Sequence, residues 1–155
     1  YDVEYHIVGT GEREEGLRDQ VKEHGIEDHV KFLGNISDER LLEEFQEAAA
    51  FVLPCVITED GDRDITPVAL REAMATQTVC VSTTISAIPE VITDGHDGVL
   101  VEPHDSESVT TAIADLLDNP ARRDTLAANA RETVETEFDI SNAVDNLENI
   151  FQSVQ

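Results

Sequence analysis

The chain has 155 residues, of which 40% are hydrophobic, and this is enough to build one buried core but not two full domains. Its 34 Asp and Glu outnumber 10 Lys and Arg, so the formal net charge is -24 at pH 7. Binding to nucleic-acid phosphates requires a basic face, so this composition argues against nucleic acid as a partner.

The acidic residues are spread along the chain among regular apolar segments. A disordered acidic tail shows instead a block of like charge with few apolar residues, and a cation-binding protein is a further interpretation of high acidity. We interpret the composition as an adaptation to high salt, which screens the repulsion between the charges. A halophilic source and salt-dependent folding are therefore predicted.

Two cysteines, Cys55 and Cys80, are too few for a disulfide framework. Each lies in an apolar stretch, which indicates reduced residues of the core. No apolar run approaches the roughly 18 residues of a membrane span, and no signal segment opens the chain. We expect a cytoplasmic protein.

Short runs typical of β-strands alternate with helical stretches as far as residue 101. Because parallel strands need crossover connections, this order predicts a Rossmann-like, doubly wound parallel sheet with helices on both faces. Strands are expected over residues 4–8, 30–33, 50–53, 79–82 and 98–101, with helices over 12–24, 38–49 and 67–76.

Helix starts are marked by capping residues. Ser37 and Thr66 suit the N-cap, where a hydroxyl accepts a hydrogen bond from a free N–H group, and Pro67 suits the first helical position. After Pro103 only helices are predicted, over residues 107–117, 120–135 and 140–151, the first of them opened by Asp105 or the next residue. We expect this helical C-terminal tail to pack on the sheet without adding strands.

A glycine turn, Gly9-Thr10-Gly11, directly follows the first predicted strand. In a doubly wound sheet, ligands bind outside the carboxyl ends of the strands, near helix N-termini. The turn fails as a dinucleotide fingerprint because Glu14 stands where the third glycine is required. It is either a tight turn that lets the backbone approach a ligand or an ordinary connection, and both interpretations remain open.

An acidic loop over residues 59–64 follows the third predicted strand, with aspartates at alternate positions. As a calcium loop it fails, because Ile65 replaces the required glycine and Arg71 replaces the bidentate glutamate. We interpret these acids as solvated loop charge and assign no metal site.

The same loop leads into the helix that carries Glu72, so Asp64 lies just before a helix N-terminus and Glu72 about two turns further on. Carboxylates accept hydrogen bonds from sugar hydroxyls, while the free N–H groups near Ile65 and Thr66 can receive phosphate or sugar oxygens. The alternative is that Asp64 is only a charge that favours the start of the helix and that Glu72 is an acid on the helix surface. From the residues alone, both interpretations stay open. For Glu90, in a later loop over residues 86–90, a structural role is favoured.

Five blocks stand in order along the chain: HIVGTGE, VKFLGNIS, AAFVLPCVITEDGD, DITPVALREAMA and VCVSTTISAIPEVITDGHDGVLVEPHD, followed by the helical tail. Together they resemble one family: the C-terminal, donor-binding half of retaining glycosyltransferases with the GT-B fold, the mannosyl- and glucosyltransferase group. Their order and spacing cover nearly the whole chain, and with the acidic composition they suggest a haloarchaeal member.

The resemblance implies roles for residues of two segments. In the family, two glutamates separated by seven residues hold the donor; Glu72 matches the one that contacts the ribose, and Asp64 stands in place of the one that contacts the transferred sugar, one methylene shorter. Ile65 replaces a usual glycine or aromatic residue. The backbone of Ile65, Thr66 and Pro67 is expected to line the sugar and phosphates.

By the same resemblance, the nucleotide base is expected near Gly9, Thr10, Gly11, Leu33 and Gly34.

Other positions depart from the family pattern. Gln77 and Thr78 replace a glycine and a proline, and Ala87 replaces a glycine. Each change removes permissive or rigid backbone, which indicates a divergent member.

The resemblance also implies that parts of the family's domain are absent from this sequence. These are a central first strand with its helix, the Arg and Lys for the donor phosphates, and the N-terminal acceptor domain. Arg63 and Arg71 are the basic residues to consider as substitutes. A missing central strand would leave unsatisfied strand edges, so we expect pairing with another chain or continuity with a preceding segment.

The function implied is donor binding for metal-independent, cofactor-free transfer of a hexose, with retention, to a glycan or lipid acceptor, by a half that is inactive alone. We expect a cytoplasmic location, either free or, for the full-length enzyme, at the membrane surface. A non-catalytic nucleotide-sugar-binding or scaffolding domain is the rival, favoured by Asp64, Ile65 and Gln77. A nicotinamide-dependent dehydrogenase is disfavoured because the glycine fingerprint and its downstream acid are missing.

Overall fold

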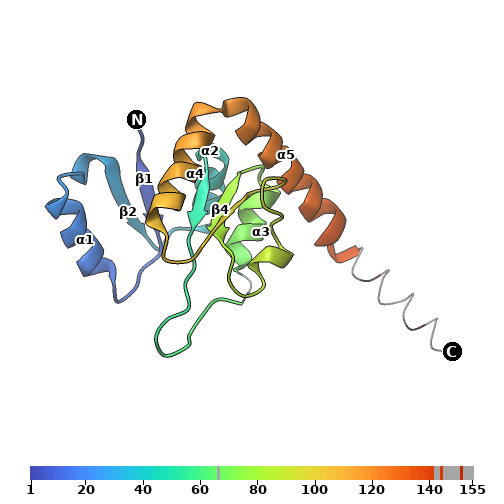
Figure 1. The fold of residues 1–155 in the computed structure, drawn as a ribbon, viewed down its shortest axis with the longest axis horizontal. Helices are drawn as coiled ribbons and strands as arrows, with labels where there is room; N and C mark the ends of the chain where they lie inside the picture. The colour runs from blue at the N-terminus through green and yellow to red at the C-terminus, as the bar shows by residue number, and fades with distance from the viewer. Residues whose placement is uncertain (66, 142–143, 145–150, 152–155) are drawn as a thin grey trace. The chain divides into compact units, whose positions relative to one another are not determined.

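The computed structural model describes residues 1–65, 67–141, 144 and 151 of the chain. Within it the chain forms two compact units, Tyr1–Glu43 and Glu44–Gln155 (Figure 1).

The first unit is built around two parallel strands, β1 (Tyr5–Val8) and β2 (Val30–Gly34). Tyr5 pairs with Val30, and the register shifts by one residue after Ile7, so that Val8 pairs with Gly34. The helix α1 (Glu14–Glu23) and the 3₁₀ helix η1 (Glu27–His29) connect the strands. Acids in the first turn of α1 and a lysine in its last turn complement the helix dipole.

The helix α2 (Asp38–Glu47) begins in the first unit and ends in the second. The backbone N–H of Arg40 donates to Ser37 Oγ at 3.3 Å, which confirms the predicted cap. Phe45 on this helix is buried, and its ring meets the ring of Phe51 edge to face with a centroid distance of 5.1 Å.

The second unit contains a parallel sheet of three strands in the order β3 (Phe51–Leu53), β4 (Cys80–Thr83) and β5 (Val99–Val101). Val52 pairs with Val81, which pairs in turn with Val99. The central strand β4 is completely buried. The outer strand β5 is closed to further pairing at Leu100, whose N–H donates to Asp94 Oδ1 at 2.9 Å.

Helices cover both faces of this three-stranded sheet. The helices α4 (Ser106–Asp118) and α5 (Pro120–Glu137) form an antiparallel hairpin (Figure 1). Its side chains Leu116 and Leu126 pack against Val81. Side chains alternate along a strand, so the neighbouring Cys80 faces α3 (Val68–Ala75), where its Sγ lies 3.7 Å from the carbonyl oxygen of Leu70.

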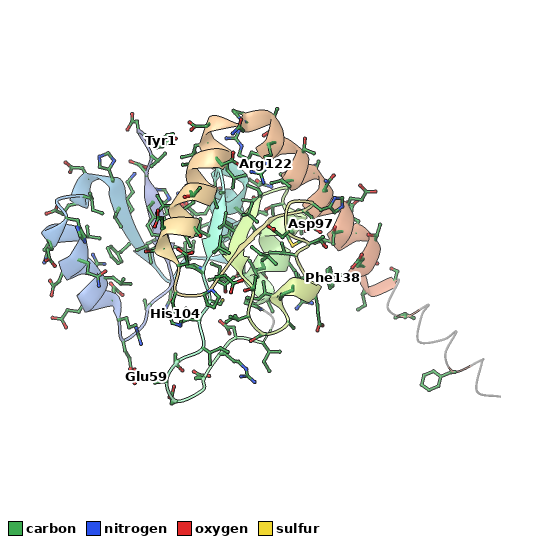
Figure 2. The ribbon with its side chains drawn as sticks, viewed as in Figure 1. Tyr1, Glu59, Asp97, His104, Arg122 and Phe138 are labelled. Atoms are coloured by element: carbon green, nitrogen blue, oxygen red, sulfur yellow. The ribbon has the colours of Figure 1, made fainter. Side chains whose placement is uncertain are left out.

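A buried carboxylate ties the loop before β5 to α5. Asp97, labelled in Figure 2, accepts from the Thr93 N–H at 2.7 Å and from Thr133 Oγ1 at 2.8 Å. These bonds satisfy the carboxylate inside the core, where an unpaired one would be costly.

The predicted α/β fold is confirmed, with all strands parallel and every predicted strand present. The strands form two sheets rather than one. Pro67 was wrongly placed in the helix: its ψ of 120° is extended, its carbonyl accepts from Leu70 N–H, and α3 begins at Val68. Thr66 and most of the helix predicted over residues 140–151 lie outside the described residues. No described helix is long and apolar enough to cross a membrane.

Candidate functional site

The chain leaving β3 is held by side chains of β4. Ser82 Oγ donates to the carbonyl of Leu53 at 2.7 Å, and Thr83 Oγ1 donates to that of Cys55 at 2.6 Å. Further along, the N–H of Ala87 donates to the carbonyl of Ile65 at 3.1 Å. The loops that follow β3 and β4 are therefore tied together at the carboxyl edge of the sheet, where ligands bind in such folds.

The acidic loop between β3 and α3 folds back on itself around Glu59 (Figure 2). Thr58 N–H donates to the carbonyl of Asp62 at 3.0 Å, and Gly61 takes a φ of 84°, which suits glycine. A hydrogen bond from Thr58 Oγ1 lowers the pKa of Asp60. Within the described part of the chain, no group of three or more His, Cys, Asp or Glu could hold a metal ion.

Asp64 and Glu72 are both exposed and available to a ligand. Neither side-chain carboxylate forms a hydrogen bond or an ion pair with any described residue. Burial, with a smaller contribution from the Asp64 carboxylate, raises the pKa of Cys55, so Asp64 lies near that thiol. Ile65 is 67% exposed, so its bulk projects into solvent at this edge.

The glycine turn of the first unit lies against the end of β2. Gly9 N–H donates to the carbonyl of Gly34 at 2.8 Å, and the φ angles of Gly9 and Gly34 are 105° and 63°. A Cβ added at Gly9, Gly11 or Gly34 would meet no atom within 4 Å, so the space beside the turn is open. The structure thus brings Gly9, Gly11 and Gly34 together, while Asp64 and Glu72 belong to the second unit.

A cavity of about 230 Å³ adjoins this turn. Beyond the turn itself, its walls include Arg13, Glu14 and Phe32, which the sequence analysis did not assign to a site. One feature of the sequence could have indicated a role for Arg13 and Glu14: they stand at the start of the helix that follows the glycine turn.

Among the described residues of this strongly acidic chain, three arginines have no carboxylate partner. Seven of the 10 Lys and Arg form ion pairs, whereas Arg13, Arg63 and Arg71 form none with any described residue. The guanidinium of Arg71 lies 5.7 Å from the Phe138 ring, and its buried Nε has no hydrogen-bond partner among the described atoms. These arginines neighbour the glycine turn and the Asp64–Glu72 segment in sequence.

Comparison with known proteins identifies one family. Residues 1–133 match the family model "Glycosyl transferases group 1". The chain is 34% identical over 149 residues to the amylovoran biosynthesis glycosyltransferase AmsK of Erwinia amylovora, covering 96% of this chain and 37% of that protein. It is 30% identical over 154 residues to a GDP-mannose-dependent monoacylated α-(1-6)-phosphatidylinositol monomannoside mannosyltransferase of Corynebacterium glutamicum, covering 98% of this chain and 39% of that protein.

Solved structures show the same fold. The Anabaena protein Alr3699/HepE in complex with UDP-glucose superposes with a TM-score of 0.82 at 21% identity, over 97% of this chain and 41% of that one. The C-terminal domain of a glycosyl transferase group 1 family protein (LpcC) from Francisella tularensis superposes with a TM-score of 0.68 at 26% identity, over 81% of this chain and 62% of that one. The chain spans well under half the length of the curated relatives described above.

Proposed function

Because this chain belongs to the glycosyl transferases group 1 family, we propose that it is the nucleotide-sugar donor-binding half of a retaining glycosyltransferase. The reaction transfers a hexose to a glycan or lipid acceptor that an N-terminal domain binds, without a metal ion or cofactor, and these 155 residues alone do not catalyse it. Relatives named for GDP-mannose and a structural neighbour holding UDP-glucose support a nucleotide sugar as the donor.

The observation that carries the proposal is the pair of exposed carboxylates Asp64 and Glu72, which have no partner among the described residues and lie in the loop and helix that follow β3. Glu72 accepts hydrogen bonds from the ribose hydroxyls. Asp64 accepts hydrogen bonds from hydroxyls of the transferred sugar, and in this proposal it is the catalytic residue. Charge-assisted hydrogen bonds of this kind are about twice as strong as neutral ones, so they orient the donor firmly.

The backbone of Ile65, Thr66 and Pro67 lines the sugar and phosphates in this proposal. Arg63 and Arg71 supply positive charge for the diphosphate, since neither is neutralised by a carboxylate among the described residues. The protein then acts mainly by positioning the donor and stabilising the departing diphosphate.

The base of the nucleotide occupies the open space beside Gly9, Thr10 and Gly11, next to Leu33 and Gly34 at the end of β2. The absence of any atom near the Cβ positions of these glycines supports close approach of a ligand to the backbone.

Titration of the full-length protein, at molar salt, with nucleoside diphosphates and their sugar conjugates tests these roles. Glu72→Ala removes the ribose contact, so it should weaken every nucleotide by roughly tenfold or more. Asp64→Ala should weaken only the sugar conjugates, by a similar factor. Glu59→Ala, in the same loop but without an assigned role, is the matched control and should change neither.

The reverse pattern of the two variants would overturn the role assignment. A protein that binds no nucleotide at all would be a scaffolding domain, the rival function. The specific observation that favours this rival is the bulky, exposed Ile65 at a position where the family places a glycine or an aromatic residue.

We also propose a halophilic source and a cytoplasmic location, at the membrane surface for the full-length enzyme. Among the described strands, β1 and β3 each pair on one side only, and in this proposal their other edges pair with a preceding strand or with another copy. The oligomeric state of the full-length protein, measured by light scattering at molar salt, separates the two: a monomer contradicts self-pairing.

A further inference from the structure

The cavity beside the glycine turn carries two charged side chains, Arg13 and Glu14, on walls that are otherwise backbone, Thr10 and apolar side chains. Pockets for drug-sized ligands measure roughly 300–1,000 Å³. At about 230 Å³, this cavity is suited to one planar ring system rather than a whole nucleotide. Ile7, Leu17 and Phe32 supply the apolar surface for the faces of such a ring.

Glu14 is held in place with one oxygen engaged and the other available. Arg18 donates through Nε and Nη2 to Glu14 Oε1, at 2.9 and 2.8 Å. The Arg18 guanidinium also lies 4.1 Å from the centre of the Phe32 ring, which fixes the pair against a cavity wall. Glu14 Oε2 accepts no hydrogen bond from any described residue, so it can accept one from a ligand.

Arg13 immediately precedes Glu14 and adds donors at the same cavity wall. It forms no ion pair with any described residue, although the chain has 34 acids. The cavity therefore offers both a carboxylate acceptor and guanidinium donors. A nucleotide base fits only if its own donors and acceptors match these groups.

We propose that this cavity takes a guanine base, so that the donor is a guanosine diphosphate sugar; the inference rests on the proposed function. Guanine presents the N1–H and 2-amino donors side by side, followed by the O6 and N7 acceptors. Glu14 Oε2, which has two lone pairs, accepts from both donors, and Arg13 donates to O6 and N7, as arginine does when it reads guanine.

The other common bases fit this pair poorly. Uracil has a single N–H flanked by two carbonyl oxygens, which a carboxylate repels. Adenine has an amino group beside the N1 acceptor, so it offers Glu14 only one donor. The relatives do not decide the base, because one is named for GDP-mannose and a structural neighbour holds UDP-glucose.

Calorimetric titration of the full-length protein with GDP, UDP and ADP at molar salt tests the proposal. GDP should bind at least tenfold more tightly than UDP or ADP. Glu14→Gln keeps an oxygen for Arg18 but puts an NH2 donor in place of the open acceptor Oε2, so it should weaken GDP about tenfold and leave UDP unchanged. Glu15→Gln, the neighbouring exposed residue that lies outside the cavity, is the control and should alter no affinity.

Equal or tighter binding of UDP or ADP would overturn the guanine assignment while leaving the proposed function intact. Uniform weakening of all three nucleotides by Glu14→Gln would also overturn it, because that result indicates a general effect on the fold. If none of the three nucleotides bound, the proposed function would fail together with the inference.

Discussion

Gln77 carries a backbone conformation that suits glycine. It follows α3 with a φ of 60°, in the left-handed region. Its N–H donates to the carbonyl of Met74, and that of Thr78 donates to Ala73, the pair of bonds that defines a Schellman motif. The motif satisfies the carbonyl groups at the end of α3. However, a residue with a side chain is strained in the left-handed region, and Gln77 occupies that position.

Replacing Gln77 with glycine should therefore stabilise the protein. Gln77→Gly relieves a strain of about 1 kcal/mol, partly offset by the greater freedom of glycine in the unfolded chain. We expect the free energy of unfolding in urea, at molar KCl, to rise by about 0.5 kcal/mol. Gln77→Ala keeps the strain and should give no gain; an equal gain for both variants would contradict this account.

Residue-scale features differ in how far the sequence predicts them. The departure of Gln77 from a glycine pattern was visible in the sequence, and the structure adds its left-handed φ. The cavity residues Arg13 and Glu14 were not predicted. The spacing of Glu14 and Arg18 is typical of a helical ion pair, but it does not indicate that Arg18 also lies over Phe32. Such contacts depend on rotamers and on the distant strand β2.

At the scale of elements, capping chemistry decides where helices begin. Asp105 accepts from the Ser108 N–H at 2.9 Å and from its hydroxyl at 2.6 Å, so it caps α4. These bonds lower the pKa of Asp105 below its ordinary value. The sequence predicted this start and that of α5 because both signals are local: Asp105 caps α4, and Pro120 takes the first helical position of α5.

The start of α3 was misplaced because its determinants are not local. The carbonyl of Ile65 is bonded to Ala87, in the loop after β4. This bond from a distant loop fixes Ile65, and Pro67 is extended. A proline suits both the first helical position and an extended residue, so the sequence alone cannot distinguish them.

Replacing Asp105 tests the cap of α4. Asp105→Ala should lower the melting temperature at neutral pH, because the N–H of Ser108 loses its acceptor. The folded pKa of Asp105 is lowered, so its ionic contribution is present above its unfolded pKa, near 3.8, and is lost as pH falls through the lower folded value. The difference between wild type and variant should therefore shrink below that pH.

Asp105→Asn provides the matched control, since asparagine also caps helices but does not titrate. It should keep most of the stability at neutral pH, and its melting temperature should lack the acid-dependent component. If the gap between wild type and Asp105→Ala stayed constant down to pH 2, the carboxylate would not be the stabilising group.

For the whole molecule, the sequence predicted the class of fold more completely than the assembly of its sheets. Alternating strands and helices identified parallel pairing, since a crossover connection leaves little choice of direction. The division of the strands into two hydrogen-bonded sheets was not predicted, because it depends on which strands are neighbours in space. Strand order is a long-range property that hydrophobic runs such as residues 51–53 do not encode.

The net charge of -24 predicts that the stability of the whole molecule depends on salt. Folding concentrates these charges, and the screening length falls from about 10 Å at 0.1 M to about 3 Å at 1 M salt. We expect the melting temperature to rise by roughly 10 °C or more from 0.1 M to molar KCl. A melt that did not change over this range would contradict the halophilic interpretation.

A charge-reduced variant distinguishes screening from a general salting-out of apolar surface. Glu15→Gln, Glu23→Gln and Asp28→Asn remove exposed acids that form no ion pair with any described residue. The triple variant should be more stable than wild type at 0.1 M KCl, because less repulsion remains to be screened, and about equal to it at molar KCl. If salt acted only by strengthening apolar burial, the two proteins would gain stability in parallel, and the difference between them would persist at every concentration.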